Sequence, residues 1–219
     1  MGDAGRKVEL LDQIARVARA LANGKRLELL DLLAQGERSV DALAKAAGLG
    51  VTTASANLQS LKAAGIVATR REGTKVYYRL AGPDVADLYA RLRDVAAAHL
   101  AEADAARRGY LGLDVAVAEF GGHELLDRVR SGELVMLDVR PGEEYAAGHI
   151  PGAVSVPLDE LAGRIAELPD GAEVVAYCRG RFCVFAHEAV RLLAAHGRPA
   201  RRLRDGMLEW RAAGLPVAA

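Results

Sequence analysis

The sequence contains few cysteines and no long apolar segment. Only two cysteines occur in 219 residues, so a framework of disulfides is excluded and both thiols are expected to be available for chemistry. No apolar run approaches the ~20 residues that a membrane span needs, and no basic segment followed by an apolar stretch opens the chain. We therefore expect a cytoplasmic protein with no membrane partner.

The formal net charge is +0, but the charge is unevenly distributed along the chain. Residues 1–82 carry 13 Lys and Arg against 8 Asp and Glu, whereas residues 83–219 carry 16 against 21. The chain is also longer than the roughly 100 to 150 residues of a common domain. We therefore expect two domains, of which the basic N-terminal one is suited to a polyanion.

The N-terminal part has helical periodicity. Apolar residues recur at three- and four-residue spacing in residues 8–22 and again in residues 25–34. Ser39 stands as an N-cap before the short helix VDALAKAA, and the helical stretch VTTASANLQSLKAAG follows and ends at Gly65. Two short helices joined by a turn that contains glycine are typical of a helix-turn-helix unit, whose second helix lies in the major groove of DNA.

The second helix of this unit carries small or amide side chains at its early exposed positions, while Leu58 and Leu61 are expected to face the core. After it, IVATRREGTKVYYRL alternates like two strands around a basic hairpin tip, whose cations point to where a phosphate backbone would lie. A charged hairpin tip is, however, often only a solvated turn. The residues expected to contact DNA are Thr52, Thr53, Ser55, Ala56, Asn57, Gln59, Arg70, Arg71 and Lys75.

In this order, the elements resemble the ArsR-type winged-helix repressors over roughly residues 8–107. The segments VTTASANLQSLKAAGIV and REGTKVYYRL are similar to that family's recognition helix and wing. The resemblance implies a mostly helical winged helix-turn-helix domain for DNA binding and dimerisation, which we expect to span residues 1–110. It also implies a homodimer formed by the first helix and a last helix at residues 84–106. Such a dimer would bind double-stranded DNA at an inverted repeat.

That family commonly senses metals or sulfur species through cysteines near the recognition helix or on the terminal helices. No cysteine precedes Cys178, so thiolate sensing within this half is excluded. The last helix offers Asp84, Asp87, His99 and Glu102, of which the last two are three residues apart and suit one side of an oxygen and nitrogen metal site. A solvated charged face explains the same residues, and we expect no resident metal and no cofactor.

A different pattern begins near Val117. Two apolar runs, LVMLDVR and EVVAYC, end in polar groups, as buried parallel strands do. Helical stretches lie at residues 158–168 and 184–196, so we expect an α/β domain with a central parallel sheet in residues 115–219. Sites in such sheets lie at the carboxyl ends of strands, and Cys178 stands at one of these ends.

The loop that starts at Cys178 has the composition of an anion-binding turn. It reads CRGRFC and leads directly into the helix VFAHEAVRLLAA, so the thiol should face backbone N–H groups and the positive end of a helix dipole. These groups, with Arg179 and Arg181, should lower the pKa of the thiol from ~8.5, and we expect Cys178 to be a thiolate. A zinc site is disfavoured because two cysteines supply at most two ligands.

The segments LDVRPGEEYAAGHIPGAVSVPL and RLRDGMLEWRAAGLPV, together with the cysteine loop, resemble the rhodanese domain over roughly residues 115–217. The resemblance implies a possible sulfurtransferase, in which Cys178 takes sulfane sulfur from a donor such as thiosulfate or a persulfide and holds it as a persulfide. It implies loop N–H groups that stabilise this persulfide and arginines that attract an anionic donor. The site residues that it implies are Cys178, Arg179, Gly180, Arg181, Phe182 and Cys183, with Asp138, Arg140 and His149 shaping the pocket floor.

The chain departs from related families at two positions of the loop. Phosphatases and arsenate reductases with this fold have an arginine as the seventh loop residue, where this chain has Val184, so ester hydrolysis is not expected. The sixth position, often Arg, Ser or Thr in sulfurtransferases, is Cys183. This residue either packs neutrally or attacks a Cys178 persulfide to form a disulfide or polysulfide bridge.

Together, the two halves favour a transcriptional regulator that carries sulfane sulfur on Cys178 and couples this state to DNA binding. The alternative is primarily a sulfurtransferase whose winged helix serves dimerisation or localisation on DNA. A third hypothesis, a constitutive repressor with an inert rhodanese domain, predicts an unperturbed thiol pKa. Nothing in the sequence shows the coupling itself, which for a typical allosteric pair is ~1 to 3 kcal/mol.

Overall fold

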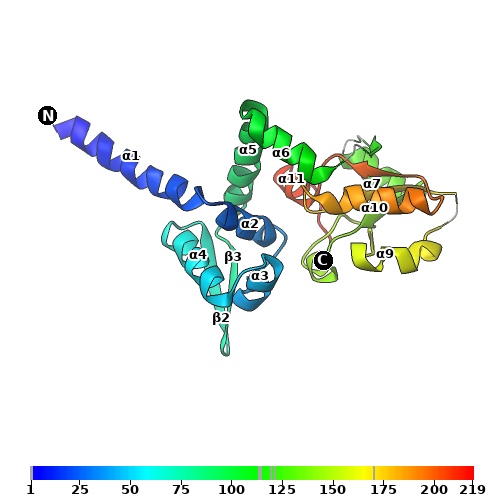
Figure 1. Cartoon of the computed structure of the whole chain (residues 1–219), viewed down its shortest axis with the longest axis horizontal. Helices are drawn as coiled ribbons and strands as arrows, with labels where there is room; N and C mark the ends of the chain where they lie inside the picture. Colours follow the sequence, from blue (N-terminus) through cyan, green and yellow to red (C-terminus); the bar gives the residue numbers. More distant parts are fainter. Residues whose placement is uncertain (1, 113–114, 119, 121, 170) are drawn as a thin grey trace. The chain divides into compact units, whose positions relative to one another are not determined.

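The structure is a computed structural model, and its chain forms two compact units that divide within helix α5 (Pro83–His99) (Figure 1). The first unit ends at Tyr89 and the second begins at Ala90, whereas the sequence analysis placed the domain boundary between residues 110 and 115. No helix in the described part of the chain has the length and apolar character to cross a membrane. The described residues are 2–112, 115–118, 120, 122–169 and 171–219.

The first unit is a winged helix-turn-helix, as predicted. Its three-stranded antiparallel sheet has the order β1-β3-β2, and the β2–β3 hairpin extends beyond α3 and α4 in Figure 1. Besides the first part of α5, its elements are α1 (Gly2–Leu21), α2 (Gly24–Leu33), β1 (Arg38–Ser39), α3 (Val40–Ala46), α4 (Val51–Ala63), β2 (Val67–Glu72) and β3 (Lys75–Leu80).

Local sequence signals set the limits of the two central helices. Ser39 is the N-cap of α3, where its Oγ accepts a hydrogen bond of 3.3 Å from Ala42 N. Gly65, at φ +75°, follows the end of α4 in the left-handed region that glycine favours. Leu58 and Leu61 of α4 are fully buried, as predicted, so the opposite face of this helix is left to solvent.

The long helix predicted at residues 84–106 is interrupted, and this part of the prediction is wrong. Helix α5 ends at His99, Leu100 adopts extended angles of φ −116° and ψ 107°, and α6 (Ala101–Leu111) follows. Neither proline nor glycine marks this break in the sequence. As a result, His99 and Glu102 lie on different helices and do not share one helical face.

The second unit contains a five-stranded sheet in the order β4-β8-β7-β5-β6, in which all neighbouring strands are parallel. This confirms the predicted α/β domain with a parallel sheet. After the end of α5 and α6, its elements are β4 (Val117–Ala118), α7 (Gly122–Arg130), β5 (Leu134–Asp138), α8 (Gly142–Ala146), β6 (Val154–Ser155), α9 (Leu158–Arg164), the 3-10 helix η1 (Ile165–Glu167), β7 (Glu173–Tyr177), α10 (Val184–Ala195), β8 (Ala200–Leu203) and α11 (Met207–Ala212).

The sheet is buried on both faces, which explains the continuous apolar runs in its strands. From β7, Val174 and Ala176 pack with residues of α9 and α10, whereas Val175 and Tyr177 pack with residues of α7 and α11. Cys178 continues this alternation and belongs to the cluster on the α10 side. The sheet therefore places the first loop cysteine at the carboxyl end of its central strand, beneath the start of α10.

Candidate functional site

The cysteine loop connects β7 to α10, and its two thiols lie on the inside. Cys178 is 3% exposed, and Cys183 is the N-cap residue of α10. The Cys178 Sγ lies 3.5 Å from Cys183 O and 3.9 Å from Gly180 O, so it faces two carbonyl oxygens as a hydrogen-bond donor. A third bond, from Cys183 N to Gly180 O at 3.0 Å, closes the turn. These two carbonyl oxygens suit a protonated thiol at Cys178, which can donate a hydrogen bond to one of them.

The pKa values of the two thiols shift in opposite directions. Burial, followed by the adjacent Cys183, raises the pKa of Cys178 well above its ordinary value, despite the N–H groups of Gly180 and Ala186. The pKa of Cys183 is lowered, chiefly because its sulfur accepts a hydrogen bond from the Cys178 thiol. The direction of the Cys178 shift is thus opposite to the lowered pKa that the sequence predicted, because burial outweighs the N–H groups of the loop.

Carboxylates neutralise the two loop arginines, which explains why these arginines do not stabilise a thiolate at Cys178. Arg179 donates to both carboxylate oxygens of Glu144, which is 1% exposed, at distances of 2.6 and 3.0 Å. Arg181 donates to Asp205 at 2.7 Å and lies 3.7 Å from Asp94. The predicted attraction of an anionic donor by these arginines is therefore largely compensated within the protein.

The start of α11 lies directly against the cysteine loop. Met207 N donates to Cys178 O at 3.0 Å, and Leu208 N donates to Arg179 O at 2.9 Å. A Cβ atom on Gly206 would collide with Cys178 O and with the backbone of Gly180, so only glycine permits this close approach. These contacts fix the loop carbonyls that point away from the thiols.

Glu209 of α11 is a buried carboxylate that collects three donors around the loop. Its oxygens accept hydrogen bonds from Gly206 N at 3.0 Å, from Arg181 N at 3.3 Å and from Arg93 Nη2 at 2.9 Å. Burial raises the pKa of this carboxyl group. Glu209 was not predicted as a site residue, although it lies in the segment RLRDGMLEWRAAGLPV. Arg93 was not predicted either, because the sequence around it carries no signal of this contact.

Phe182 is the aromatic residue of the loop, and cations from two helices lie over its ring. The guanidinium carbon of Arg93, in α5, is 4.5 Å from the ring centroid, and that of Arg107, in α6, is 5.9 Å from it. Arg93 thus contacts the loop twice, through Glu209 and through Phe182. The end of α5 and the cysteine loop form one connected network within the second unit.

Asp138 and Arg140 lie below the loop in a fully buried ion pair of 2.6 Å. Tyr177 OH donates to Asp138 Oδ2 at 2.6 Å, and Arg140 Nη2 also donates to Gly148 O at 2.9 Å. Four donors, the N, Nε and Nη2 of Arg140 and the hydroxyl of Tyr177, surround this carboxylate, so it is suited to holding the end of β7 in place. Both side chains of the ion pair are fully buried, and their part in shaping the pocket floor stays a prediction.

His149, the other residue expected in the pocket floor, organises the surrounding chain. Its ring stacks on Tyr145 with centroids 3.7 Å apart, and its backbone pairs with Ala218 through bonds of 2.8 and 2.9 Å. This residue therefore fastens the C-terminal segment to the loop before β6.

The predicted DNA-contacting residues of α4 lie mainly at the surface. Thr52, Thr53 and Ala56 are exposed, whereas Ser55 and Asn57 are partly buried. The Asn57 amide donates to Thr53 O, one turn earlier, at 3.0 Å. Gln59 is exposed, but its amide donates to Tyr78 OH in β3 at 2.9 Å. The early turns of α4 thus present most of the predicted polar face, while Gln59 also holds the wing.

The wing consists of β2 and β3 joined through Gly73, which has φ +56°. Arg71 and Lys75 are exposed near its tip, as expected for contacts to phosphates. Arg70 donates to Glu37 and to Glu72, each at 2.7 Å, so its charge is largely compensated. Arg70 is accordingly less available for a phosphate contact than Arg71 and Lys75.

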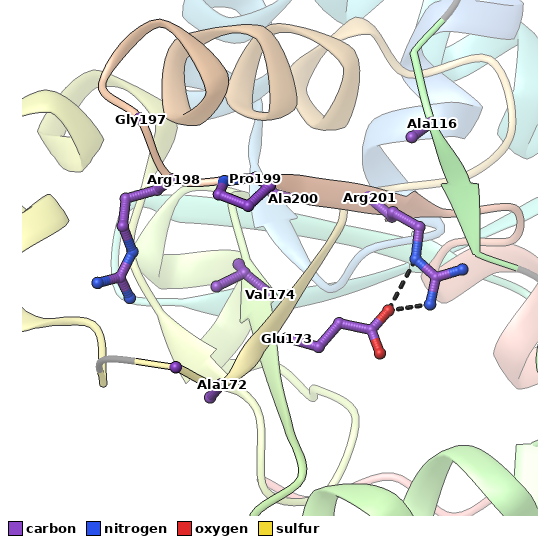
Figure 2. A pocket seen from close by; sticks show the side chains of 10 residues that line it. Ala116, Ala172, Glu173, Val174, Gly197, Arg198, Pro199, Ala200 and Arg201 are labelled. Carbon is purple, nitrogen blue, oxygen red and sulfur yellow. Dashed lines mark hydrogen bonds and ion pairs between the residues drawn. The ribbon is translucent and has the colours of Figure 1, made fainter.

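A separate hollow of about 630 Å³ lies at the amino ends of β7 and β8 (Figure 2). The cysteine loop follows the other end of β7. Its charged groups contact one another or the backbone: Glu173 accepts from Arg201 and from Arg128, and Arg198 donates to Leu168 O. Among the residues that the structure describes, no group of three or more His, Cys, Asp or Glu side chains could hold a metal ion.

Comparison with known proteins agrees with both units. The family model described as a helix-turn-helix domain matches residues 21–70, and the one described as a rhodanese-like domain matches residues 122–213. The HTH-type transcriptional regulator Rv0324 of Mycobacterium tuberculosis is 57% identical over 217 residues, covering 99% of this chain and 95% of that protein. The chain belongs to the ArsR-type helix-turn-helix regulators. It is a DNA-binding transcriptional regulator with a rhodanese domain.

Other relatives of this regulator match one of its halves. A protein named sulfurtransferase from Allochromatium vinosum is 34% identical over 104 residues, covering 47% of this chain and 96% of that protein. The solution structure of the homodimeric winged helix-turn-helix DNA-binding domain of Mb0332 from Mycobacterium bovis, fragment 1–100, is 61% identical. It covers 47% of this chain and 94% of that chain, with a TM-score of 0.43.

Proposed function

We propose that this regulator responds to sulfane sulfur. Cys178 accepts a sulfur atom from thiosulfate or a small persulfide, and the loaded state binds an operator with a different affinity from the reduced state. The observation that supports this most directly is the arrangement of the thiols: the only two cysteines of the chain share one loop, and Cys178 faces Cys183 at the carboxyl end of the sheet. A regulator of this kind would act in the cytoplasm, where thiols stay reduced.

We infer that Cys183 is the proton acceptor of the first step, and the opposite pKa shifts of the pair support this role. Cys183 ionises first, and its thiolate takes the proton of Cys178 as the Cys178 sulfur attacks the outer sulfur of thiosulfate. A new S–S bond forms at Cys178, the S–S bond of thiosulfate breaks, and sulfite leaves with the electron pair. With a persulfide donor, the leaving group is the donor's thiolate.

Operator binding would use the exposed start of α4 and the tip of the wing. In a two-fold dimer, two copies of α4 enter successive major grooves of an inverted repeat, and Arg71 and Lys75 contact phosphates. Exposed apolar side chains on α1 and α5 support the homodimer, since such residues are usually covered by a partner surface. They are Val8, Leu10, Leu11 and Ile14 on α1, and Leu88, Leu92 and Val95 on α5.

A second candidate function is sulfur transfer as the main activity, with the winged helix serving only dimerisation or localisation on DNA. The similarity of the second half to a protein named sulfurtransferase favours it. The two candidates differ in turnover: an enzyme passes sulfur repeatedly to an acceptor such as cyanide, whereas a sensor needs to be loaded only once per signal.

Intact-mass spectrometry of the full chain after treatment with thiosulfate or glutathione persulfide tests the loading step. A persulfide adds about 32 Da, and a bridge between the two cysteines removes about 2 Da relative to the reduced chain. We expect one of these products in the unmodified protein, and in Cys178→Ser no persulfide at Cys183. Loading that is equal in Cys178→Ser would contradict the role of Cys178, and rapid repeated transfer to cyanide would favour the enzyme.

A further inference from the structure

In the peptide group between Gly180 and Arg181, the carbonyl oxygen faces the Cys178 thiol and the N–H faces α11. Its carbonyl oxygen lies 3.9 Å from Cys178 Sγ, while its N–H donates to Glu209 at 3.3 Å. A carbonyl oxygen suits a protonated thiol, which can donate a hydrogen bond to it. It does not suit an anion, because the negative ends of the two groups repel. The orientation of this peptide therefore matches the sulfur-free state of the loop.

Sulfur loading changes what this peptide faces. A persulfide is more acidic than the thiol that it replaces, so its terminal sulfur is an anion that requires N–H donors inside a buried loop. Cys178 is 3% exposed, and water offers little compensation there. Rotation of the Gly180–Arg181 peptide would add the Arg181 N–H to the N–H groups of Gly180 and Ala186 that already face the sulfur. The rotation changes ψ of Gly180, which glycine tolerates, and φ of Arg181.

The same rotation disturbs Glu209. Its carboxylate loses the Arg181 N–H and meets the Gly180 carbonyl oxygen in its place. The space is tight, since a Cβ atom on Gly180 would lie 3.0 and 3.2 Å from the Glu209 oxygens and 3.3 Å from Arg93 Nη2. Arg93 and Glu209 are only 10% and 11% exposed, so a change in their contact is weakly screened by solvent.

We propose that Arg93 is a positioning residue of the cysteine loop, through which helix α5 responds to the sulfur state of Cys178. This inference rests on the proposed function and names its route of coupling. In the reduced state, Arg93 holds Glu209, which holds the Arg181 N–H, and its guanidinium lies over the Phe182 ring. In the loaded state, the rotated peptide weakens both contacts and releases this part of α5.

Helix α5 is the element that links this contact to the DNA-binding unit. One helical turn before Arg93, Tyr89 OH donates to Asp31 Oδ1 of α2 at 3.2 Å. On the same helix, Leu92 and Val95 are exposed and available to a second copy of the chain. A shift of Arg93 therefore acts on a helix that is also anchored to the winged helix and that carries part of the proposed dimer surface.

The test uses the full chain and two variants that remove the same charge from the same helix. Arg93→Gln breaks the contacts with Glu209 and Phe182, and Arg91→Gln, on the exposed side of α5, is the matched control. Each protein is loaded with glutathione persulfide to the same extent, as measured by intact mass. The affinity for the DNA upstream of its own gene is then measured by fluorescence anisotropy, before and after loading, at one salt concentration.

We expect loading to change the affinity about tenfold in the unmodified protein and in Arg91→Gln, and less than about twofold in Arg93→Gln. An equal response of Arg93→Gln and the unmodified protein, at equal loading, would overturn the route through Arg93 while leaving the proposed function intact. Failure of the unmodified protein to respond would instead overturn the proposed function, and this inference with it.

A second measurement uses only the unmodified protein, so it does not require any variant to fold. Hydrogen–deuterium exchange of the unmodified protein, reduced and loaded, reports on the backbone of residues 90–99 and of the loop. We expect faster exchange in residues 90–99 after loading, together with a changed rate at the Arg181 amide, whose hydrogen-bond partner changes from Glu209 to the persulfide. Exchange that changes in the loop but not in residues 90–99 would contradict a response of α5.

Discussion

The Arg179 guanidinium donates to both oxygens of the Glu144 carboxylate, which is almost fully buried at 1% exposure. The partners are 35 residues apart and join the cysteine loop to α8. This pair sets the electrostatics of the site, because an arginine beside the reactive cysteine is matched by a carboxylate. The loop therefore gains little attraction for anionic reagents from Arg179.

Glu144→Gln should uncover the charge of Arg179. We expect Cys178 and Cys183 to react faster with the anion iodoacetate, relative to neutral iodoacetamide, by about threefold or more. The variant should also unfold more easily, by about 1–3 kcal/mol, since a mostly buried charge loses its partner. Reaction rates from mass spectrometry and urea unfolding measure the two effects. Glu143→Gln, at the exposed neighbouring position, is the control. An unchanged ratio of the iodoacetate and iodoacetamide rates in Glu144→Gln would contradict the electrostatic account.

The order in which the two thiols ionise predicts the pH dependence of alkylation. The lowered pKa of Cys183 means that its thiolate is present at a lower pH, whereas the raised pKa of Cys178 delays its thiolate to a higher pH. Iodoacetamide should therefore modify Cys183 before Cys178 as the pH is raised. Peptide mass mapping of a pH series measures this order. Modification of Cys178 at a lower pH than Cys183 would mean that the loop N–H groups outweigh burial.

Gly206→Ala should damage the cysteine loop through a steric contact alone. The added Cβ atom collides with Cys178 O and the Gly180 backbone, although the backbone angle of φ −121° suits any residue. We expect loss of most sulfur loading, while binding of the reduced protein to DNA is kept, because the winged helix lies in the other unit. Gly163→Ala is the control, since a Cβ atom there meets nothing within 4 Å. Normal loading of Gly206→Ala would show that the loop tolerates displacement.

The wing residues should differ in their contribution to the salt dependence of DNA binding. Lys75→Ala removes an exposed cation and should reduce the slope of log affinity against log salt by about 1. Arg70→Ala should reduce it by less than about half as much, because Glu37 and Glu72 already compensate that charge. Anisotropy titrations at several salt concentrations measure both slopes. Equal slopes for the two variants would mean that Arg70 contacts phosphates in the complex and that its ion pairs with Glu37 and Glu72 are broken there.

Local sequence signals predicted the elements that local interactions determine. Ser39 and Gly65 mark helix ends through their own capping contacts, and Cys178 was placed at a strand end by the apolar run before it. The break at Leu100 escaped prediction because no proline or glycine causes it. Short strands such as β6 and β8 were not predicted, because they contain too few residues to show an alternation of apolar and polar side chains.

The contacts that tune the candidate site could not be predicted in the same way. Arg179 meets Glu144 across 35 residues, and Arg93 meets Glu209 across 116, so only the folded sheet brings these charges together. The pKa of Cys178 was predicted to be lowered, whereas burial of the thiol, which the sequence does not show, raises it. The sequence placed Cys178 at the end of a strand, whereas the residues that surround its loop became visible only in the structure.

The most direct test of the account is the affinity of the reduced and the persulfide-treated protein for the DNA upstream of its own gene, measured by fluorescence anisotropy in parallel with Cys178→Ser. We predict a change of about tenfold in the unmodified protein, reversed by dithiothreitol, and no change in Cys178→Ser. Equal affinity of the reduced and loaded forms of the unmodified protein would contradict the account and leave a repressor that carries an independent rhodanese domain.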